Sequence, residues 1–465
     1  MTIQDSTIQD RALPLSSASL LPWLQGPVDR VLAWRNGSPI QVGCFLGQAR
    51  ALADELGSGN LVVNLCEDRY AFLLVHAASL LDGRSTIMPP SRAAGPLAEI
   101  LAQHPQAVGV SDHPGHDALD TRIIVPATLS TDPQSFQVRN PATGLPADHV
   151  VAIAYTSGSH SQPQAHCKHL IDLQHSNAGN QRLLSQTLGP SFNILATVPP
   201  QHMYGFELSV ILPLLSSGIA MDCAKPLLPA EVRSALQHLP APRLLVTTPL
   251  HLQALLRADL DLDFEAAVSA TAPLDPRLAM AVEARWKAPM LEVYGSTETC
   301  VFASRRPAQD PRWSPYADVH IEPRPDGARI RAPQLPAPVV LADLIELESD
   351  GRFHLRGRCA DLLEIAGKRA SLADLNRRLL SISGIEDGVI FQHEAPDVMG
   401  VKRLAALVVA PTLHERQIRE YLSEILDPAF MPRPLRRVTA LPHNATGKLP
   451  KAELMALLRA GIPSA

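Results

Sequence analysis

The residues of this chain best suited to hold an anion form one short loop. Thr156, Ser157, Gly158 and Ser159 directly follow the apolar run 150–154, which has the pattern of a short buried strand. Such a loop can turn backbone N–H groups and hydroxyls toward a phosphate. It is not a Walker A loop, because it lacks a second glycine followed by lysine and Ser or Thr. Taken alone, these residues favour an ordinary turn, and a phosphate site needs further support.

Three later segments contain residues suited to nucleotide chemistry. They are Val293-Tyr294-Gly295-Ser296-Thr297-Glu298-Thr299, then 357–361 (Gly-Arg-Cys-Ala-Asp) with 367–369 (Gly-Lys-Arg), and 441–448 (Leu-Pro-His-Asn-Ala-Thr-Gly-Lys). With the loop, they resemble in order and spacing four motifs of the adenylate-forming superfamily of acyl-CoA synthetases, adenylation domains and luciferases. Those motifs are the phosphate loop, Tyr-Gly-x-Thr-Glu, the hinge and the C-terminal lysine motif.

The resemblance implies that the protein makes an acyl-adenylate. A carboxylate attacks the α-phosphate of ATP and pyrophosphate leaves, so the protein must bring anions together and neutralise developing charge. ATP and Mg²⁺ are therefore the implied cofactors. The implied contacts are Thr156, Ser157, Gly158 and Ser159 to the β- and γ-phosphates, Thr297 to the α-phosphate, Thr271 and Ala272 to the adenine edge, Tyr294 with Gly295 for stacking on adenine, Asp343 and Arg358 to the ribose, and Glu298 with Thr156 to Mg²⁺.

The resemblance also implies roles in binding and activating the acid. His202 would orient the carboxylate or gate the acid pocket, and Lys448 would reach the carboxylate and the developing adenylate. The implied catalytic residues are His202, Thr297, Glu298 and Lys448, and the implied substrate-pocket residues are His202, Tyr204 and Phe206. Each also has an ordinary reading: a Glu after Ser-Thr can cap a helix, and an Asp in a hairpin can fix a turn.

The chain departs from the family pattern at its phosphate loop and hinge. His160, Ser161 and Gln164 stand where the family commonly has Thr, Gly and Lys, so the loop lacks its usual closing cation. We expect Lys168 to supply that charge. At the hinge, Ala360 takes the place of the usual acid, which leaves the location of the hinge clear and its mechanics open.

Four further segments resemble one short branch of the superfamily. They are 64–70 (Asn-Leu-Cys-Glu-Asp-Arg-Tyr), 88–93 (Met-Pro-Pro-Ser-Arg-Ala), 199–205 (Pro-Pro-Gln-His-Met-Tyr-Gly) and 269–274 (Ser-Ala-Thr-Ala-Pro-Leu). The branch comprises the ligases of aryl polyene and xanthomonadin-type pigment clusters, which load a hydroxybenzoate-like acid onto an acyl carrier protein. Two alternatives stay open: an acyl- or aryl-CoA ligase that uses free coenzyme A, and a non-catalytic nucleotide- or acyl-binding relative.

Strands and helices are expected to alternate through most of the chain. Helices are predicted at 45–56, 69–81, 170–188 and 372–380, and strands at 60–65, 107–111, 123–125, 193–198, 244–247, 389–392 and 404–409. Such alternation predicts an α/β fold with layered, mixed or parallel sheets covered by helices. A β-rich portion is expected between 305 and 356, with a hairpin turn at Ser349-Asp350-Gly351. The predicted domains are 1–358, which would bind the nucleotide, and 359–465, a small mobile α+β domain.

Composition narrows the class of partner. The 465 residues are 46% hydrophobic and carry a net charge of −5, with six scattered cysteines. The acidic balance argues against a general nucleic-acid binder, although the part from 361 onward is mildly basic and suits an acidic partner. The start of the chain is polar and acidic, unlike a secretory signal, and the apolar run 71–81 is too short to span a bilayer. We therefore expect a cytoplasmic protein without a membrane span.

Overall fold

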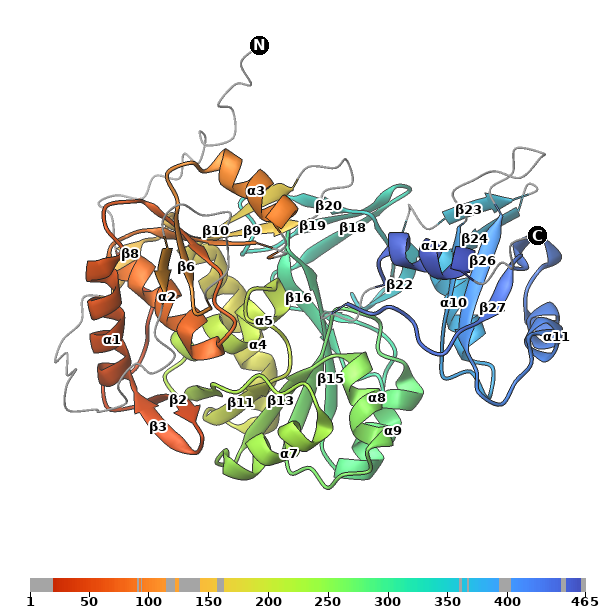
Figure 1. The fold of residues 1–465 in the computed structure, drawn as a ribbon, viewed down its shortest axis with the longest axis horizontal. Coiled ribbons are helices and arrows are strands. Elements are labelled where there is room, and N and C mark those ends of the chain that lie inside the picture. Colours follow the sequence, from red (N-terminus) through yellow and green to blue (C-terminus); the bar gives the residue numbers. More distant parts are fainter. Residues whose placement is uncertain are drawn as a thin grey trace, which may run out of the picture. The chain divides into compact units, whose positions relative to one another are not determined.

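The computed structural model describes residues 20–89, 92, 94–113, 122–124, 143–156, 163–358, 362–365, 368–392, 403–444 and 449–460. The chain divides into two compact units (Figure 1). The first contains Met1–Asp310, Tyr316–Val319 and Arg331–Pro338, and the second contains Pro311–Pro315, His320–Ile330 and Val339–Ala465. The predicted domains 1–358 and 359–465 concern which parts move, and they stay a prediction.

The first sheet of the first unit follows the predicted alternation of strands and helices. Its strands lie in the order β10-β9-β5-β4-β6-β7 and run parallel, except for the edge strand β10. Their bounds are Leu61–Asn64 (β4), Ser85–Met88 (β5), Val108–Ser111 (β6), Arg122–Ile124 (β7), Val150–Thr156 (β9) and Gln164–His169 (β10). A separate short pair joins β1 (Leu20–Pro22) to β8 (Gly144–Pro146).

Helices cover both faces of this first sheet. They are α1 (Val42–Glu55), α2 (Arg69–Leu81) and α3 (Ala94–Gln103). Ala152 and Ala154 of β9 belong to the core that α1 and α2 share, whereas Ile153 and Tyr155 belong to the core under α3. This separation follows because successive side chains of a strand point to opposite faces.

The second sheet of this unit carries most of the candidate site. The strands that the first unit contributes to this sheet lie in the order β16-β15-β14-β13-β11-β12-β2-β3 and run parallel except for β16 and β3. Their bounds are Val31–Arg35 (β2), Ser38–Gln41 (β3), Phe192–Ala196 (β11), Ile219–Asp222 (β12), Arg243–Thr247 (β13), Ala266–Ser269 (β14), Met290–Ser296 (β15) and Cys300–Arg305 (β16).

Two groups of helices cover this second sheet. One face packs against α7 (Pro229–His238), α8 (Pro249–Arg257) and α9 (Pro276–Trp286). The other packs against α4 (Leu170–Leu188) and the segment made of α5 (Met203–Phe206), a π-helical turn (Glu207–Ile211) and α6 (Leu212–Leu214). The second group places the predicted acid-side residues next to the strands that carry the predicted nucleotide residues.

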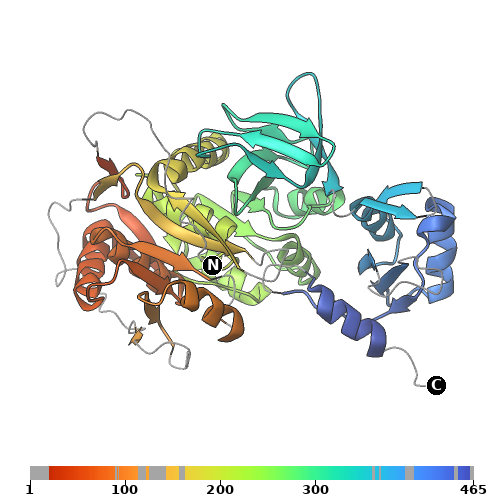
Figure 2. The same ribbon diagram turned by 90° about the horizontal axis from the view of Figure 1, so that it is seen from above.

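The second unit combines β-hairpins with a small α+β body. Its sheets are β18-β19-β20, β21-β22, β23-β24 and β25-β26-β27. The strands are Ser314–Pro315 (β17), His320–Arg324 (β18), Gly327–Arg331 (β19), Val339–Leu341 (β20), Asp343–Leu347 (β21), Phe353–Arg358 (β22), Leu362–Ile365 (β23), Lys368–Ser371 (β24), Asp387–Gln392 (β25), Leu404–Val409 (β26) and Leu435–Arg437 (β27). The helices α10 (Leu372–Leu380), α11 (Glu415–Ile425) and α12 (Lys451–Ala460) pack on the last sheet, seen in blue in Figure 2.

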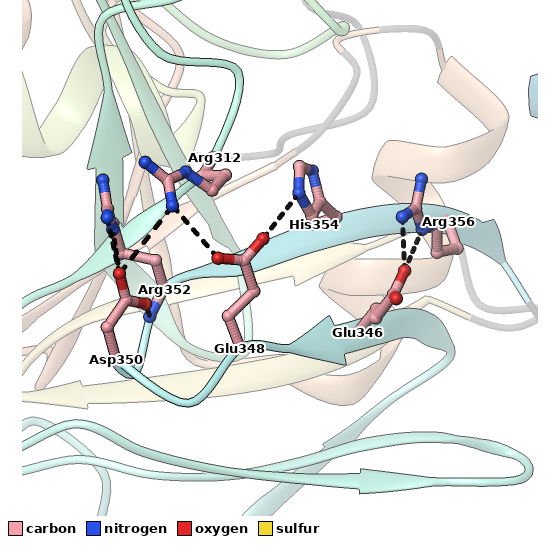
Figure 3. Close-up of polar contacts among 7 residues, drawn as sticks. All are labelled: Arg312, Glu346, Glu348, Asp350, Arg352, His354 and Arg356. Carbon is pink, nitrogen blue, oxygen red and sulfur yellow. Dashed lines mark hydrogen bonds and ion pairs between the residues drawn. The ribbon is translucent and has the colours of Figure 1, made fainter.

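Charged pairs fix the register of the β21–β22 hairpin (Figure 3). Glu348 accepts from Arg312 at 3.0 Å and lies 3.1 Å from His354. In the same view Asp350 pairs with Arg352, and Glu346 pairs with Arg356. Of these pairs, Glu348–His354 and Glu346–Arg356 join the two sides of the hairpin, and such pairs add little stability each but disfavour a slipped register. The hairpin therefore holds its far ends, Asp343 and Arg358, opposite each other.

The α/β fold expected from the sequence is confirmed, and several elements have the predicted bounds. The helices at 69–81, 170–188 and 372–380 and the strand at 404–409 have the expected limits, and the hairpin turn lies at 349–351. Within the portion expected to be β-rich, β20 and β21 follow each other closely in the chain but belong to different sheets. Within the described part of the chain, no helix is long and apolar enough to cross a membrane.

Candidate active site

The β9–β10 hairpin places the start of the predicted phosphate loop. Thr156 ends β9 and pairs with Gln164 at the start of β10. The Oγ1 atom of Thr156 lies 3.0 Å from Nε2 of His166, two residues further along β10. Ser157, Gly158 and Ser159 lie outside the described residues.

The turn between β15 and β16 presents the second set of predicted residues. Its backbone is held by Thr299, whose Oγ1 accepts from the N–H of Ser296 at 3.0 Å and donates to the carbonyl of Cys300 at 2.9 Å. A Cβ on Gly295 would lie 2.2 Å from the carbonyl oxygen of Cys300, so only glycine fits there. Gly295 and Thr299 are therefore needed for the backbone of this turn. The turn leaves Thr297 and Glu298 partly exposed.

His166 connects these two hairpins, and sequence reasoning gave it no role. Its Nε2 lies 3.0 Å from Oγ1 of Thr156 and 3.9 Å from Oε1 of Glu298. Burial lowers the pKa of His166, and the carboxylate of Glu298 opposes this shift. The only sequence signal for it is its position two residues before Lys168 on an alternating strand. Thr156 and Glu298, which the sequence places far apart, therefore lie beside one imidazole nitrogen.

The donor atoms at this point suit a hard divalent cation. Burial of Glu298 opposes its ionisation, but a hydrogen bond with Ser296 and the charges of His166 and Lys168 outweigh burial and lower the pKa of Glu298. An ionised carboxylate and a hydroxyl oxygen are ligands that Mg²⁺ accepts, and water and phosphate oxygens commonly complete its shell. Among the described residues, no group of three or more His, Cys, Asp and Glu could hold a metal alone. Glu298 and Thr156 thus fit the predicted role as a partial Mg²⁺ site.

Lys168 contacts the backbone of the turn between β15 and β16. Its side chain is only 5% exposed, and its Nζ donates to the carbonyl oxygen of Glu298 at 3.3 Å. The alternation along β10 explains this placement, because Lys168 and His166 point to the same face of the strand. The predicted contact of Lys168 with a phosphate stays a prediction.

The predicted acid-side residues fall into two different cores. Tyr204 packs with Leu208 and Val268, and its hydroxyl lies 2.7 Å from the carbonyl oxygen of Val268. Phe206 is fully buried in the other core, 5.2 Å from the ring of His76. The structure therefore does not bring Phe206 to the apolar wall that contains Tyr204.

The short helix that carries these side chains begins at a close backbone approach. His202 is the N-cap of α5, and its carbonyl oxygen accepts from the N–H of Phe206 at 2.7 Å. A Cβ on Gly205 would lie 2.1 Å from the carbonyl oxygen of Pro199. The glycine of the His-x-Tyr-Gly motif is thus required for the chain to turn back against Pro199.

The predicted adenine residues follow the ends of two neighbouring parallel strands. Thr271 and Ala272 come after β14, and Tyr294 and Gly295 lie near the end of β15. The carboxyl ends of parallel strands are the usual ligand site of such sheets. Thr271 has φ +77°, a left-handed conformation that a β-branched residue rarely adopts. The ring of Tyr294 packs edge-on to Phe302 at 5.0 Å.

The predicted ribose residues belong to the second unit. Asp343 and Arg358 are cross-strand partners in the β21–β22 hairpin, and Asp343 is half-buried. The side chain of Arg358 and all of Lys448 lie outside the described residues. Shortly before Lys448, the Nε2 of His443 lies 2.7 Å from the carboxylate of Asp387 in β25. This contact ties the lysine-motif segment to the α+β body of the second unit.

Comparisons with known proteins agree with this arrangement. Residues 61–323 match the model of the AMP-binding enzyme family. The chain is 28% identical over 318 residues to 4-coumarate–CoA ligase of Halorhodospira halophila, covering 63% of this chain and 73% of that protein. It is 25% identical over 463 residues to sulfoacetate–CoA ligase of Cupriavidus necator, covering 88% and 84%.

The solved structures show the same fold. ATP-bound MatB from Rhodopseudomonas palustris superposes with a TM-score of 0.78 at 18% identity, covering 93% of this chain and 96% of that one. The family match includes strands of both sheets of the first unit and contains Thr156, His166, Lys168 and Glu298. The chain therefore belongs to the AMP-binding enzyme family, within the acyl-CoA ligase superfamily.

Proposed function

We propose that this protein activates a hydroxybenzoate-like acid with ATP and passes the acyl group to the phosphopantetheine thiol of an acyl carrier protein, as the first step of an aryl polyene or xanthomonadin-type pigment. The coarser part of this assignment follows from the family: the chain is a ligase that adenylates a carboxylic acid with ATP. The acid, the carrier protein and the pigment pathway are the proposed part.

The observation that carries the proposal is the meeting of Thr156 and Glu298 at His166. Adenylation joins a carboxylate to a phosphate, so the reaction is limited by repulsion between anions and by charge that develops on the leaving pyrophosphate. Glu298 and Thr156 would hold Mg²⁺, which when bound supplies the compensating positive charge. Thr297 would donate its hydroxyl to the α-phosphate, and His202 would orient the attacking carboxylate.

The proposal places the ring of the acid beside Tyr204. Its neighbours in the apolar cluster are Leu208, Val268, Ala270, Val293 and Val301. Val268 lies near the end of β14, and Ala270 follows that strand directly before Thr271. A flat apolar ring would gain more from such walls than a short charged acid would. The similarity to a 4-coumarate ligase supports an aryl acid, whereas the sulfoacetate ligase keeps a small aliphatic acid as the rival.

Free coenzyme A is the second candidate acceptor. The named relatives are coenzyme A ligases, which favours it. Both acceptors end in the same phosphopantetheine thiol, so the chemistry of transfer is identical and only the recognised surface differs.

The deciding experiment supplies the same acid and ATP with either acceptor. We expect hydroxybenzoates to support transfer to a phosphopantetheinylated carrier protein with kcat/KM at least about tenfold above that for coenzyme A. Transfer to coenzyme A alone would keep the ligase and overturn the carrier protein. Transfer of sulfoacetate or a fatty acid in preference to benzoates would overturn the aryl assignment. A failure of every acid to support adenylation would favour a non-catalytic relative.

A further inference from the structure

Arg69 is a fully buried cation outside the residues assigned to ATP and the acid. It begins α2, which covers the first sheet, and its guanidinium reaches the second sheet. There its Nη2 donates to the carbonyl oxygens of Ala196 at 2.8 Å and Val198 at 2.7 Å, at and just beyond the end of β11. Because a buried charge is costly unless hydrogen bonds satisfy it, these contacts must be well formed for the protein to fold as it does.

The guanidinium of Arg69 lies where two neighbouring parallel strands separate. The pairing of β11 with β12 ends two residues before Ala196. Beyond that point Arg69 bridges the two chains, because it donates to Ala196 and Val198 on one side and, from Nε, to the carbonyl oxygen of Ala224 after β12 at 3.5 Å. A planar guanidinium with five N–H donors can serve both sides, whereas the ammonium group of a lysine is a point donor.

The remaining contact of Arg69 reaches the segment 199–205. Its Nη1 donates to the hydroxyl of Ser209, which is fully buried in the π-helical turn, and that hydroxyl donates to the carbonyl oxygen of Gly205 at 2.6 Å. Arg69 therefore holds both ends of this segment, directly at Val198 and through Ser209 at Gly205. The chain between these two contacts forms the turn in which α5 begins.

The other side of this turn is fixed by Tyr204. Its hydroxyl lies 3.1 Å from the carbonyl oxygen of Thr247 and 2.7 Å from that of Val268, near the ends of β13 and β14. The backbone around His202, the N-cap of α5, is thus anchored from two sides. Arg69 anchors it to β11 and to the π-helical turn, and Tyr204 anchors it to β13 and β14.

We infer that Arg69 is a positioning residue of the acid site, which holds the 199–205 turn so that His202 meets the carboxylate of the acid. The inference rests on the proposed function, because it takes the role of His202 from there. A displacement of about 1 Å in a group that orients a reactant can cost about 100-fold in rate. The alternative is a purely structural role, in which Arg69 stabilises the junction of the two sheets and nothing else.

A matched control for Arg69→Lys is Arg84→Lys. Arg84 lies just beyond the other end of α2 and is 7% exposed. It donates to the carbonyl oxygens of Leu56 at 3.2 Å and Gly57 at 2.5 Å, at the end of α1. It is therefore a second buried arginine on backbone carbonyls in the same unit. Both substitutions should lower the melting temperature by about 2 °C or more, so this readout alone does not separate the two roles.

Amide hydrogen exchange tests the hold on the turn without any substrate. Arg69→Lys should speed exchange in peptides that cover 197–209 by about tenfold or more, because local opening of the turn becomes easier. Arg84→Lys should leave the same peptides within about twofold of the unmodified protein. Equal exchange rates in the two variants would overturn the positioning role.

A double-mutant cycle with His202→Ala connects the turn to the acid. The readout is kcat/KM for a hydroxybenzoate in the exchange of pyrophosphate into ATP. Arg69→Lys should lower it about tenfold or more and leave equilibrium binding of ATP within about twofold. In the His202→Ala background, Arg69→Lys should cost less than about a further twofold, because it acts through His202. A full tenfold loss in that background would overturn the inference.

The outcomes separate this inference from the proposed function. If Arg69→Lys does not fold, Ser209→Ala takes its place, because it removes only the link to Gly205. It should speed hydrogen exchange in 197–209 and lower kcat/KM for the acid by about threefold each, and unchanged values would overturn the inference. If the unmodified protein activates no acid, the proposed function fails, while amide hydrogen exchange still decides whether Arg69 holds the turn.

Discussion

Single side chains from different elements build the candidate site, and their environments set their chemistry. Thr156 and Glu298 approach one nitrogen of His166, and the surroundings lower the pKa of Glu298 and keep it ionised. The sequence motifs identified Thr156 and Glu298 because loop composition and the Tyr-Gly-x-Thr-Glu pattern are local signals. They could not identify His166, whose role depends on a strand pairing and not on its neighbours in sequence.

At the residue scale, Thr271 carries a testable strain. Its φ of +77° is costly for a β-branched side chain, by about 1–3 kcal/mol. Thr271→Gly should therefore raise the free energy of unfolding by about 1 kcal/mol, measured by urea denaturation. Because Thr271 is the predicted adenine contact, ATP affinity measured alongside shows whether the strain has a role in binding. An unchanged or lower stability would mean that contacts of the side chain outweigh its backbone cost.

Helices and strands with a strong repeating pattern were predictable, and irregular ones were not. The bounds of α2 and α4 follow from apolar spacing and from a cap such as Asp68, whose carboxylate accepts from the N–H of Ala71 at 2.8 Å. The π-helical turn at Glu207–Ile211 has no sequence signature, because it depends on packing against α4 and β16. Ser176 and Asn180 of α4 are buried, although polar residues at their positions in the sequence pattern predict an exposed face of the helix.

At the element scale, α2 buries a histidine that should make stability depend on pH. His76 is fully buried, its Nδ1 lies 2.9 Å from Thr86, and burial lowers its pKa to about 3. Between the unfolded value of about 6.5 and about 3, the unfolded chain binds a proton that the folded chain does not. The contribution of His76 to the free energy of unfolding is therefore fully present above about pH 6.5. It falls as the pH is lowered, by about 2 kcal/mol at pH 5.

The variant His76→Asn tests this contribution. It keeps a polar group near Thr86 but cannot take up the proton, so its stability at pH 7 should fall while the loss between pH 7 and pH 5 shrinks by about 2 kcal/mol. His320→Asn, at an exposed histidine of β18, serves as the control substitution. An unaltered profile in His76→Asn would contradict neutral burial of this histidine.

At the scale of the whole molecule, the candidate residues are distributed over two compact units. Thr156, His166 and Glu298 belong to the first, whereas Asp343 and the segment before Lys448 belong to the second. The sequence predicted this division of labour only through resemblance, since no physical pattern in Asp343 or Lys448 marks them as nucleotide contacts. We further propose, from the resemblance to the superfamily, that 359–465 turns about a hinge near 358–361 between adenylation and thiol transfer.

A half-reaction assay tests the hinge proposal. Lys448→Ala should slow adenylation by about 100-fold or more, because the positive charge that would stabilise the reacting carboxylate and the developing adenylate is lost. Thioester formation from supplied acyl-adenylate should continue at nearly the rate of the unmodified protein. Lys451→Ala, at the start of α12, removes a nearby exposed lysine and should affect neither step. Equal losses in both half-reactions would argue that Lys448 does not act in adenylation alone.

Acid-dependent exchange of pyrophosphate into ATP tests the central claim most directly. We predict exchange with a hydroxybenzoate in the unmodified protein and a loss of about 100-fold or more in Glu298→Gln, which keeps the size of the side chain but removes its charge. Benzoates and fatty acids in the same assay define the acid. Exchange that persists in Glu298→Gln, or its absence with every acid, would contradict an adenylating site at Thr156, His166 and Glu298.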